Sequence, residues 1–223
     1  MKIKFDEDCI TIGDFNEAQV CIIWLHGYGA NNWTFEPIMK TIHLKLDEKV
    51  FIVVPNAPIE DQKRSWYPLP QKNSDDELVE DCEGLMKAIN PLRELLHNMV
   101  YASLETSDKK FFLVGGFSQG AALSLGMLCD PDTVIDGCIS ISGYMPCAEF
   151  FRTKAQMDNE KLYISHGTKD DVINIETHRQ TMGFLQTLKI NIKETVNNFG
   201  HTVPNEIIDD IVSWIHANYI TNK

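Results

Sequence analysis

The chain has 223 residues, of which 43% are hydrophobic, and its formal net charge is −12 at pH 7. This length suits one domain, which we expect to span residues 1–223. The negative charge disfavours nucleic acid as a partner, and the apolar runs are strand-length, which disfavours integral membrane association. The first residues lack the apolar core of a signal peptide, so a cytoplasmic protein is expected.

Strand-like and helix-like runs alternate along the chain. A capping box, Ser74-Asp75-Asp76-Glu77, is expected to open a helix whose apolar stripe Pro91 kinks or breaks. The alternation predicts an α/β fold with a mostly parallel central sheet, helices on both faces and no large lid domain. Strands are expected near residues 2–5, 9–12, 19–25, 50–55, 111–116, 137–142, 161–166 and 191–197, and further helices from Asn31 or Asn32 to Leu46 and over 119–129, 175–189 and 205–218.

The expected strand 19–25 ends in His26-Gly27-Tyr28-Gly29. Glycines in such a loop let backbone N–H groups face a site at the end of the strand, and the pattern resembles the oxyanion loop of serine hydrolases. His26 is expected to be structural, because an imidazole beside a buried loop more often bonds the backbone than transfers protons.

The most informative motif is Gly116-Phe117-Ser118-Gln119-Gly120, a G-x-S-x-G pattern between an apolar strand and a run of small helix-forming residues. A serine on a sharp strand-to-helix turn projects its hydroxyl away from the sheet, toward a base and toward backbone donors. Side chains at Gly116 or Gly120 would collide where the strand end and the first helical turn nearly touch. The motif therefore predicts a nucleophile elbow at Ser118.

A base and an acid follow the serine in the chain order typical of this fold. Asp170 and Asp171 come just after the expected strand 161–166, at the end of the sheet where open parallel sheets place their active sites. His201 follows the last expected strand. Because alternate residues of an extended segment point in opposite directions, only one of the two aspartates can face His201.

These segments together resemble the small phospholipase/carboxylesterase family of α/β-hydrolases, which includes acyl-protein thioesterases and bacterial carboxylesterases. The resemblance also covers Pro55-Asn56-Ala57-Pro58 and Ser65-Trp66-Tyr67. It implies a catalytic triad of Ser118, Asp170 and His201, with oxyanion donors at the backbone N–H groups of Tyr28 and Gln119. Asp170 is preferred because the acid of the family stands fifth in its HGxxD phrase.

The expected function is a serine hydrolase that cleaves ester or thioester bonds of acyl substrates, such as a lipidated protein or a lysophospholipid, through an acyl-enzyme. No cofactor or metal is required. Trp66, Tyr67 and Leu69 are candidate walls of an acyl groove, with core packing as the competing interpretation. Two alternatives remain: a non-catalytic binding protein on the same fold, and an acyltransferase with the same triad.

The six cysteines are scattered and include no C-x-x-C pair. We expect all of them to be reduced core thiols. They are Cys9, Cys21, Cys82, Cys129, Cys138 and Cys147.

Overall fold

The computed structural model describes residues 8–76, 78–106, 108–155 and 160–220, so the strand expected at 2–5 lies outside the described residues. A seven-stranded sheet forms the centre, and all neighbouring strands run parallel except the first pair. The expected mostly parallel sheet is thus confirmed. Its spatial order is β1 (Ile10–Ile12), β3 (Val50–Val54), β2 (Val20–Leu25), β8 (Phe111–Phe117), β9 (Gly137–Ile141), β10 (Lys161–Gly167) and β11 (Asn191–Asn197).

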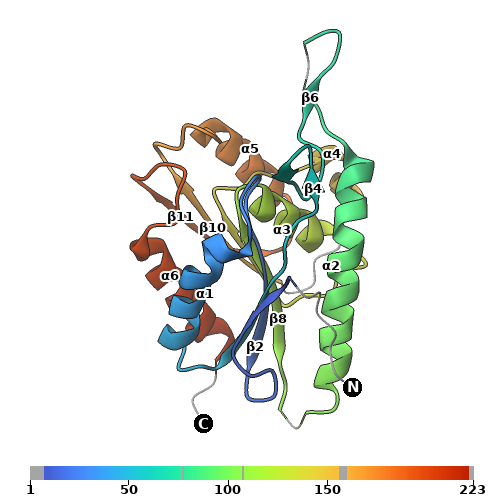
Figure 1. Cartoon of the computed structure of the whole chain (residues 1–223). Coiled ribbons are helices and arrows are strands. Elements are labelled where there is room, and N and C mark those ends of the chain that lie inside the picture. Colours follow the sequence, from blue (N-terminus) through green and yellow to red (C-terminus); the bar gives the residue numbers. More distant parts are fainter. Residues whose placement is uncertain (1–7, 77, 107, 156–159, 221–223) are drawn as a thin grey trace.

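Helices cover both faces of the sheet (Figure 1). The central strands are apolar on both sides: in β2, Cys21, Ile23 and Leu25 pack into one core cluster while Val20, Ile22 and Trp24 pack into the other. One face carries α1 (Asn32–Lys45) and α6 (Asn205–Tyr219), and the other carries α2 (Cys82–Ser103), α3 (Gln119–Cys129), α4 (Ala148–Arg152) and α5 (Ile175–Leu185). No helix in the described part of the chain is both long and apolar enough to cross a membrane.

The capping box predicted at residues 74–77 is wrong: Ser74, Asp75 and Asp76 lie in a turn, no helix begins there, and Glu77 lies outside the described residues. Residues around it form a hairpin of β6 (Gln71–Lys72) and β7 (Leu78–Val79), which projects from the body of the molecule (Figure 1). Serine and aspartate serve turns as readily as helix caps, and Asp76 adopts a positive φ of 64° there. The true cap of α2 is Asp81, whose carboxylate accepts a hydrogen bond of 2.8 Å from the Gly84 N–H.

Two further expectations about helices need adjustment. Helix α2 runs unbroken from Cys82 to Ser103 through Pro91. Burial of Leu85, Ile89 and Leu96 in the core beside α3 compensates for the hydrogen bond that proline cannot donate. Helix α5 ends at Leu185, four residues earlier than expected. A second small hairpin, β4 (Ile59–Glu60) with β5 (Lys63–Arg64), has no counterpart among the predicted strands.

The expectation that all six cysteines are free thiols is wrong for one pair. Cys82 at the start of α2 and Cys147 just before α4 form a disulfide across a sequence separation of 65 residues. Sequence spacing cannot reveal this pair, because only the fold brings the starts of the two helices together. Burial raises the pKa of Cys21 and of Cys129 to about 12, which is typical of inert core thiols.

The disulfide should contribute measurably to stability. Replacing both Cys82 and Cys147 by Ala is expected to lower the free energy of unfolding by about 2–4 kcal/mol, because the unfolded chain gains the entropy that the cross-link removes. Urea denaturation with and without a phosphine reductant provides the measurement. The reductant should destabilise the wild-type protein and leave the double variant unchanged; an equal response of the two proteins would contradict the pairing.

Candidate active site

Ser118 lies at the turn between β8 and α3, with backbone angles φ 56° and ψ −120°. Few residues other than glycine adopt such angles, and two hydrogen bonds hold the turn: the Ser118 N–H donates to Ile141 O at 3.0 Å, and its carbonyl accepts from the Ala122 N–H at 2.9 Å. A Cβ atom on Gly116 would lie 2.5 Å from the Gly120 carbonyl carbon. The geometry is that of a nucleophile elbow.

His201 connects the serine to a carboxylate. Its Nε2 lies 3.0 Å from Ser118 Oγ, and its Nδ1 lies 2.7 Å from Asp170 Oδ2. The imidazole follows β11 and packs its ring 4.6 Å from the ring of Phe117, measured between centroids. Three side chains that are far apart in the sequence thus form one hydrogen-bonded series at the carboxyl ends of β8, β10 and β11.

The loop after β10 fixes the carboxylate of Asp170. Its other oxygen, Oδ1, accepts hydrogen bonds from the N–H groups of Val172 at 2.9 Å and Ile173 at 2.8 Å. Burial by itself would raise the pKa of Asp170, but the hydrogen bonds from His201, Ile173 and Val172 together outweigh it, so the pKa lies below its ordinary value. Asp171 is exposed on the outside of the same loop, and only Asp170 bonds the imidazole.

His166 forms a hydrogen bond with the backbone of this loop. The side chain is fully buried, and its Nε2 donates to the carbonyl of Ile173 at 2.7 Å, one residue beyond Val172 in the turn that holds Asp170. Burial lowers the pKa of His166, which favours the neutral ring. The sequence placed His166 at the end of a strand without identifying this contact.

Two backbone N–H groups near the serine belong to different elements. Gln119 is the first residue of α3, and Tyr28 lies in the loop after β2. Among the described residues, no hydrogen bond within the protein uses the N–H of either residue. Gly27 brings the loop close to the elbow, since a Cβ atom there would lie 3.3 Å from Ser118 Cβ. Both amides are therefore available as donors beside Ser118.

His26 has the structural role that the sequence suggested. Its Nδ1 donates to the carbonyl of Gly27 at 2.8 Å, and its Nε2 accepts from the Ala57 N–H at 3.0 Å. Burial lowers the pKa of His26, in agreement with a neutral ring that donates at one nitrogen and accepts at the other. The side chain links the loop after β2 to the loop after β3.

A cavity of about 680 Å³ opens beside Ser118. Tyr28 and Leu69 line it, and Glu80 adds a carboxylate, whose Oε2 accepts from the Cys147 N–H at 3.0 Å. Its apolar wall consists of Leu69, Pro70, Leu78, Tyr144, Met145, Ala148, Val172, Ile173 and Phe184.

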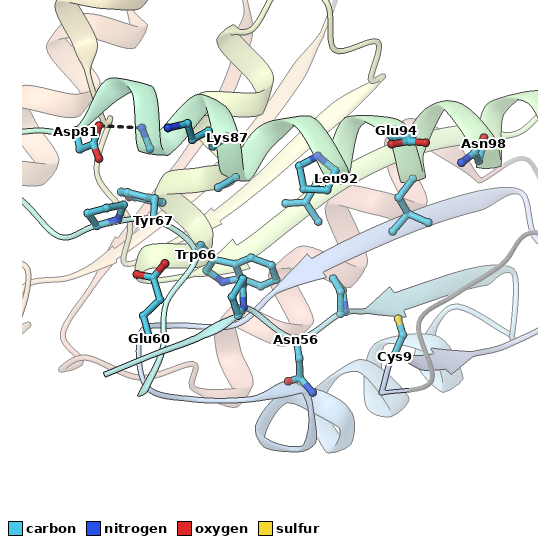
Figure 2. A pocket seen from close by; sticks show the side chains of 17 residues that line it. Cys9, Asn56, Glu60, Trp66, Tyr67, Asp81, Lys87, Leu92, Glu94 and Asn98 are labelled. Atoms are coloured by element: carbon cyan, nitrogen blue, oxygen red, sulfur yellow. Dashed lines mark hydrogen bonds between the residues drawn. The ribbon is translucent and has the colours of Figure 1, made fainter. Parts of the chain in front are cut away.

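Trp66 and Tyr67 lie elsewhere. They line a separate cavity of about 730 Å³ between α2 and the loop after β3 (Figure 2). Only 8% of Trp66 and 4% of Tyr67 is exposed, and neither side chain lines the cavity beside Ser118. Of the three candidate groove residues, the structure thus brings Leu69 alone to the serine. Among the described residues no cluster of three or more potential ligands is arranged to hold a metal ion.

Sequence reasoning identified Gln119 only through its backbone. Its side chain is 2% exposed and bonds three successive residues, Ser65, Trp66 and Tyr67. The G-x-S-x-G motif accepts any residue at this position, so the motif does not predict a role for the glutamine side chain. The one hint in the sequence was the Ser65-Trp66-Tyr67 phrase, whose residues it contacts.

The fold and the site geometry define an α/β-hydrolase. The family model described as Phospholipase/Carboxylesterase matches residues 9–219, so the chain belongs to that family. Acyl-protein thioesterase 1 of Candida albicans is 29% identical over 222 residues, covering 90% of this chain and 92% of its own length. The crystal structure of Zea mays acyl-protein thioesterase 2 superposes with a TM-score of 0.76 at 23% identity, covering 94% of this chain and 98% of the maize chain, which supports the fold.

Relatives named carboxylesterases and thioesterases support a carboxylic ester hydrolase as the general class. Membership alone does not establish activity, since a relative from Oryza sativa that is 24% identical over 205 residues is named a probable inactive carboxylesterase. That relative matches 87% of this chain and 82% of its own length.

Proposed function

We propose that the protein is a serine hydrolase that cleaves ester or thioester bonds of acyl substrates, with Ser118 as nucleophile, His201 as base and Asp170 as orienting acid. The observation that carries the proposal is the hydrogen-bonded series of these three side chains at the elbow. A hydroxyl 3.0 Å from an imidazole that is itself held by a buried carboxylate is arranged for proton transfer.

In the proposed mechanism, Ser118 Oγ attacks the acyl carbonyl carbon as His201 Nε2 takes its proton. The N–H groups of Tyr28 and Gln119 donate to the oxyanion of the tetrahedral intermediate. The intermediate collapses to an acyl-enzyme as His201 gives the proton to the departing alcohol or thiol. Water, deprotonated by the same imidazole, then releases the carboxylic acid and regenerates Ser118. Asp170 holds the tautomer with the proton on Nδ1 throughout.

The cavity beside Ser118 supports an acyl chain as the recognised group. Its volume of about 680 Å³ falls within the usual range of small-ligand sites, and its walls are largely apolar. Half-exposed Tyr28 and Leu69 stand at its edge, each 42% accessible. Lipidated proteins and lysophospholipids both present an acyl chain on a larger polar body, and both belong to the proposed substrate class.

The first test is hydrolysis of p-nitrophenyl esters from acetate to palmitate by the wild-type protein and by Ser118→Ala. We expect the wild type to turn over and the variant to lose at least about 10³-fold in kcat, because the attacking oxygen is gone while the cavity is intact. Matched esters and thioesters of the preferred acyl chain then compare the two leaving groups.

The same assay separates the alternatives. Equal inactivity of the two proteins across the series would contradict the hydrolase proposal and favour a binding protein. Acyl transfer would appear as acylated alcohol or amine in the products when an acceptor is added, with Ser118→Ala again inactive.

A further inference from the structure

The side chain of Gln119 occupies a fully satisfied buried position. Its Oε1 accepts from the Trp66 N–H at 3.1 Å, while its Nε2 donates to Tyr67 O at 2.8 Å and to Ser65 Oγ at 3.1 Å. Rotating the amide by half a turn would place donor against donor and acceptor against acceptor, so the network determines its orientation. The Ser65 hydroxyl reinforces the same turn by donating to Tyr67 O at 2.8 Å.

The segment around residues 64–67, which Gln119 holds, forms hydrogen bonds with the loop after β2 on both sides of Tyr28. On one side, the indole N–H of Trp66 donates to His26 O at 2.7 Å, and the two rings pack with centroids 5.1 Å apart. On the other side, the N–H of Gly29 donates to Arg64 O at 2.8 Å. The Tyr28 side chain is 42% exposed, so its amide is held mainly by the bonds of its neighbours: these two, and those that His26 makes to Gly27 O and to the Ala57 N–H.

We propose that the carboxamide of Gln119 is a positioning residue for the oxyanion hole. Its backbone N–H supplies one proposed donor, and its side chain fixes, through Ser65, Trp66 and Tyr67, the loop that carries the other donor at Tyr28. One residue thus sets the spacing between two donors that belong to different elements, and an oxyanion hole depends on that spacing. The inference rests on the proposed function of Ser118 and goes beyond it.

The same arrangement assigns Trp66 and Tyr67 a role. They connect α3 to the loop after β2, rather than forming a wall of the acyl cavity. The bond from Trp66 to His26 is the step that transmits the position of Gln119 to the loop.

Three variants test the proposal with the best p-nitrophenyl ester as substrate. Gln119→Ala keeps the backbone donor of residue 119 and removes the carboxamide that positions the Tyr28 N–H. We expect kcat to fall roughly 100-fold with little change in KM, because a displaced Tyr28 N–H amounts to the loss of one oxyanion donor, which has effects of this order. Trp66→Phe removes the indole N–H and should lower kcat about 10-fold. Because Gln119 acts on the loop through Trp66, the two losses should not add. The kcat of the double variant should therefore be at most about 3-fold lower than that of Gln119→Ala alone.

Ser124→Ala is the matched control. Ser124 is also fully buried in α3, and its hydroxyl donates to Gly120 O at 2.8 Å, so the variant loses a buried hydrogen bond without touching residues 65–67. Its kcat and KM should match those of the wild type. A trifluoromethyl ketone, which forms a tetrahedral adduct with the serine, should bind Gln119→Ala more weakly by the same factor as the loss in kcat, whereas the matching alcohol should bind equally well.

Deuterium exchange provides a readout that needs no turnover. Amides in residues 26–30 should exchange faster in Gln119→Ala and Trp66→Phe than in the wild type or Ser124→Ala. Unchanged exchange in those two variants would overturn the proposal, and so would a rise in KM with kcat unchanged. If the wild type hydrolyses no ester but the exchange changes as expected, the hydrolase proposal fails while the anchoring of the loop by Gln119 stands.

Discussion

Asp170→Asn is expected to lower kcat/KM about 10⁴-fold, because the asparagine would favour the wrong tautomer of His201. The N–H groups of Val172 and Ile173 both point at one oxygen of the side chain. An asparagine would turn its carbonyl oxygen toward these donors and its NH₂ group toward His201 Nδ1. The imidazole would then carry its proton on Nε2, where it can no longer accept the proton of Ser118.

Asp171→Asn is the control for this experiment, since it makes the same change in charge one residue away on an exposed side chain. We expect less than about a twofold change in kcat/KM, because an exposed charge is screened by solvent. A larger loss for Asp171→Asn than for Asp170→Asn would move the orienting acid to Asp171. Circular dichroism of both variants checks that the fold is retained.

Gly120→Ala is expected to destabilise the protein by about 3 kcal/mol, at the upper end of the usual cost of overpacking, and to abolish activity in whatever remains folded. A Cβ atom at this position would lie 2.2 Å from Leu25 O and 2.6 Å from His26 O. These atoms belong to the backbone at the end of β2, so no side-chain rotation relieves the collision. Relief would require the loop that carries Tyr28 to move away from the elbow.

Gly126→Ala provides a matched substitution six residues further along α3. A Cβ atom there would meet its nearest neighbour, Ile89 Cδ1, at 3.4 Å, which is ordinary contact. Alanine should therefore be neutral or stabilise the helix by up to about 1 kcal/mol, through its better helix propensity. Urea denaturation measures both variants, and equal destabilisation of the two would show that the close approach at Gly120 is unimportant.

Much of the sheet was readable from the sequence because its central strands are buried on both faces. Continuous apolar runs such as Val20–Leu25 and Val50–Val54 have few other structural interpretations. The secondary structure of the segment between β3 and α2 was predicted incorrectly. Its polar, turn-forming residues suit a helix cap and a hairpin equally well, and the pairing of β6 with β7 in the structure distinguishes the two.

The candidate site divides in a similar way. Ser118, Asp170 and His201 stand at strand ends, where topology brings them together. Motif and chain order were sufficient to propose Ser118, His201 and one of two adjacent aspartates, and the family resemblance selected Asp170. The disulfide and the contacts of Gln119 depend on which loops lie side by side. Trp66 looked like a groove residue because large aromatic side chains suit either a groove or a core, and sequence carries no measure of burial.

The backbone angles of Ser118 have a consequence for how this chain can change over evolution. A φ of 56° with a ψ of −120° costs on the order of 1–3 kcal/mol for a residue with a Cβ atom, and glycine would avoid that cost. Folding stability alone would therefore favour glycine over serine here, and the nucleophilic role that we propose for Ser118 offers a reason for the hydroxyl. On the proposed function, the protein gives up part of its thermodynamic margin at Ser118 in exchange for a nucleophile at the elbow.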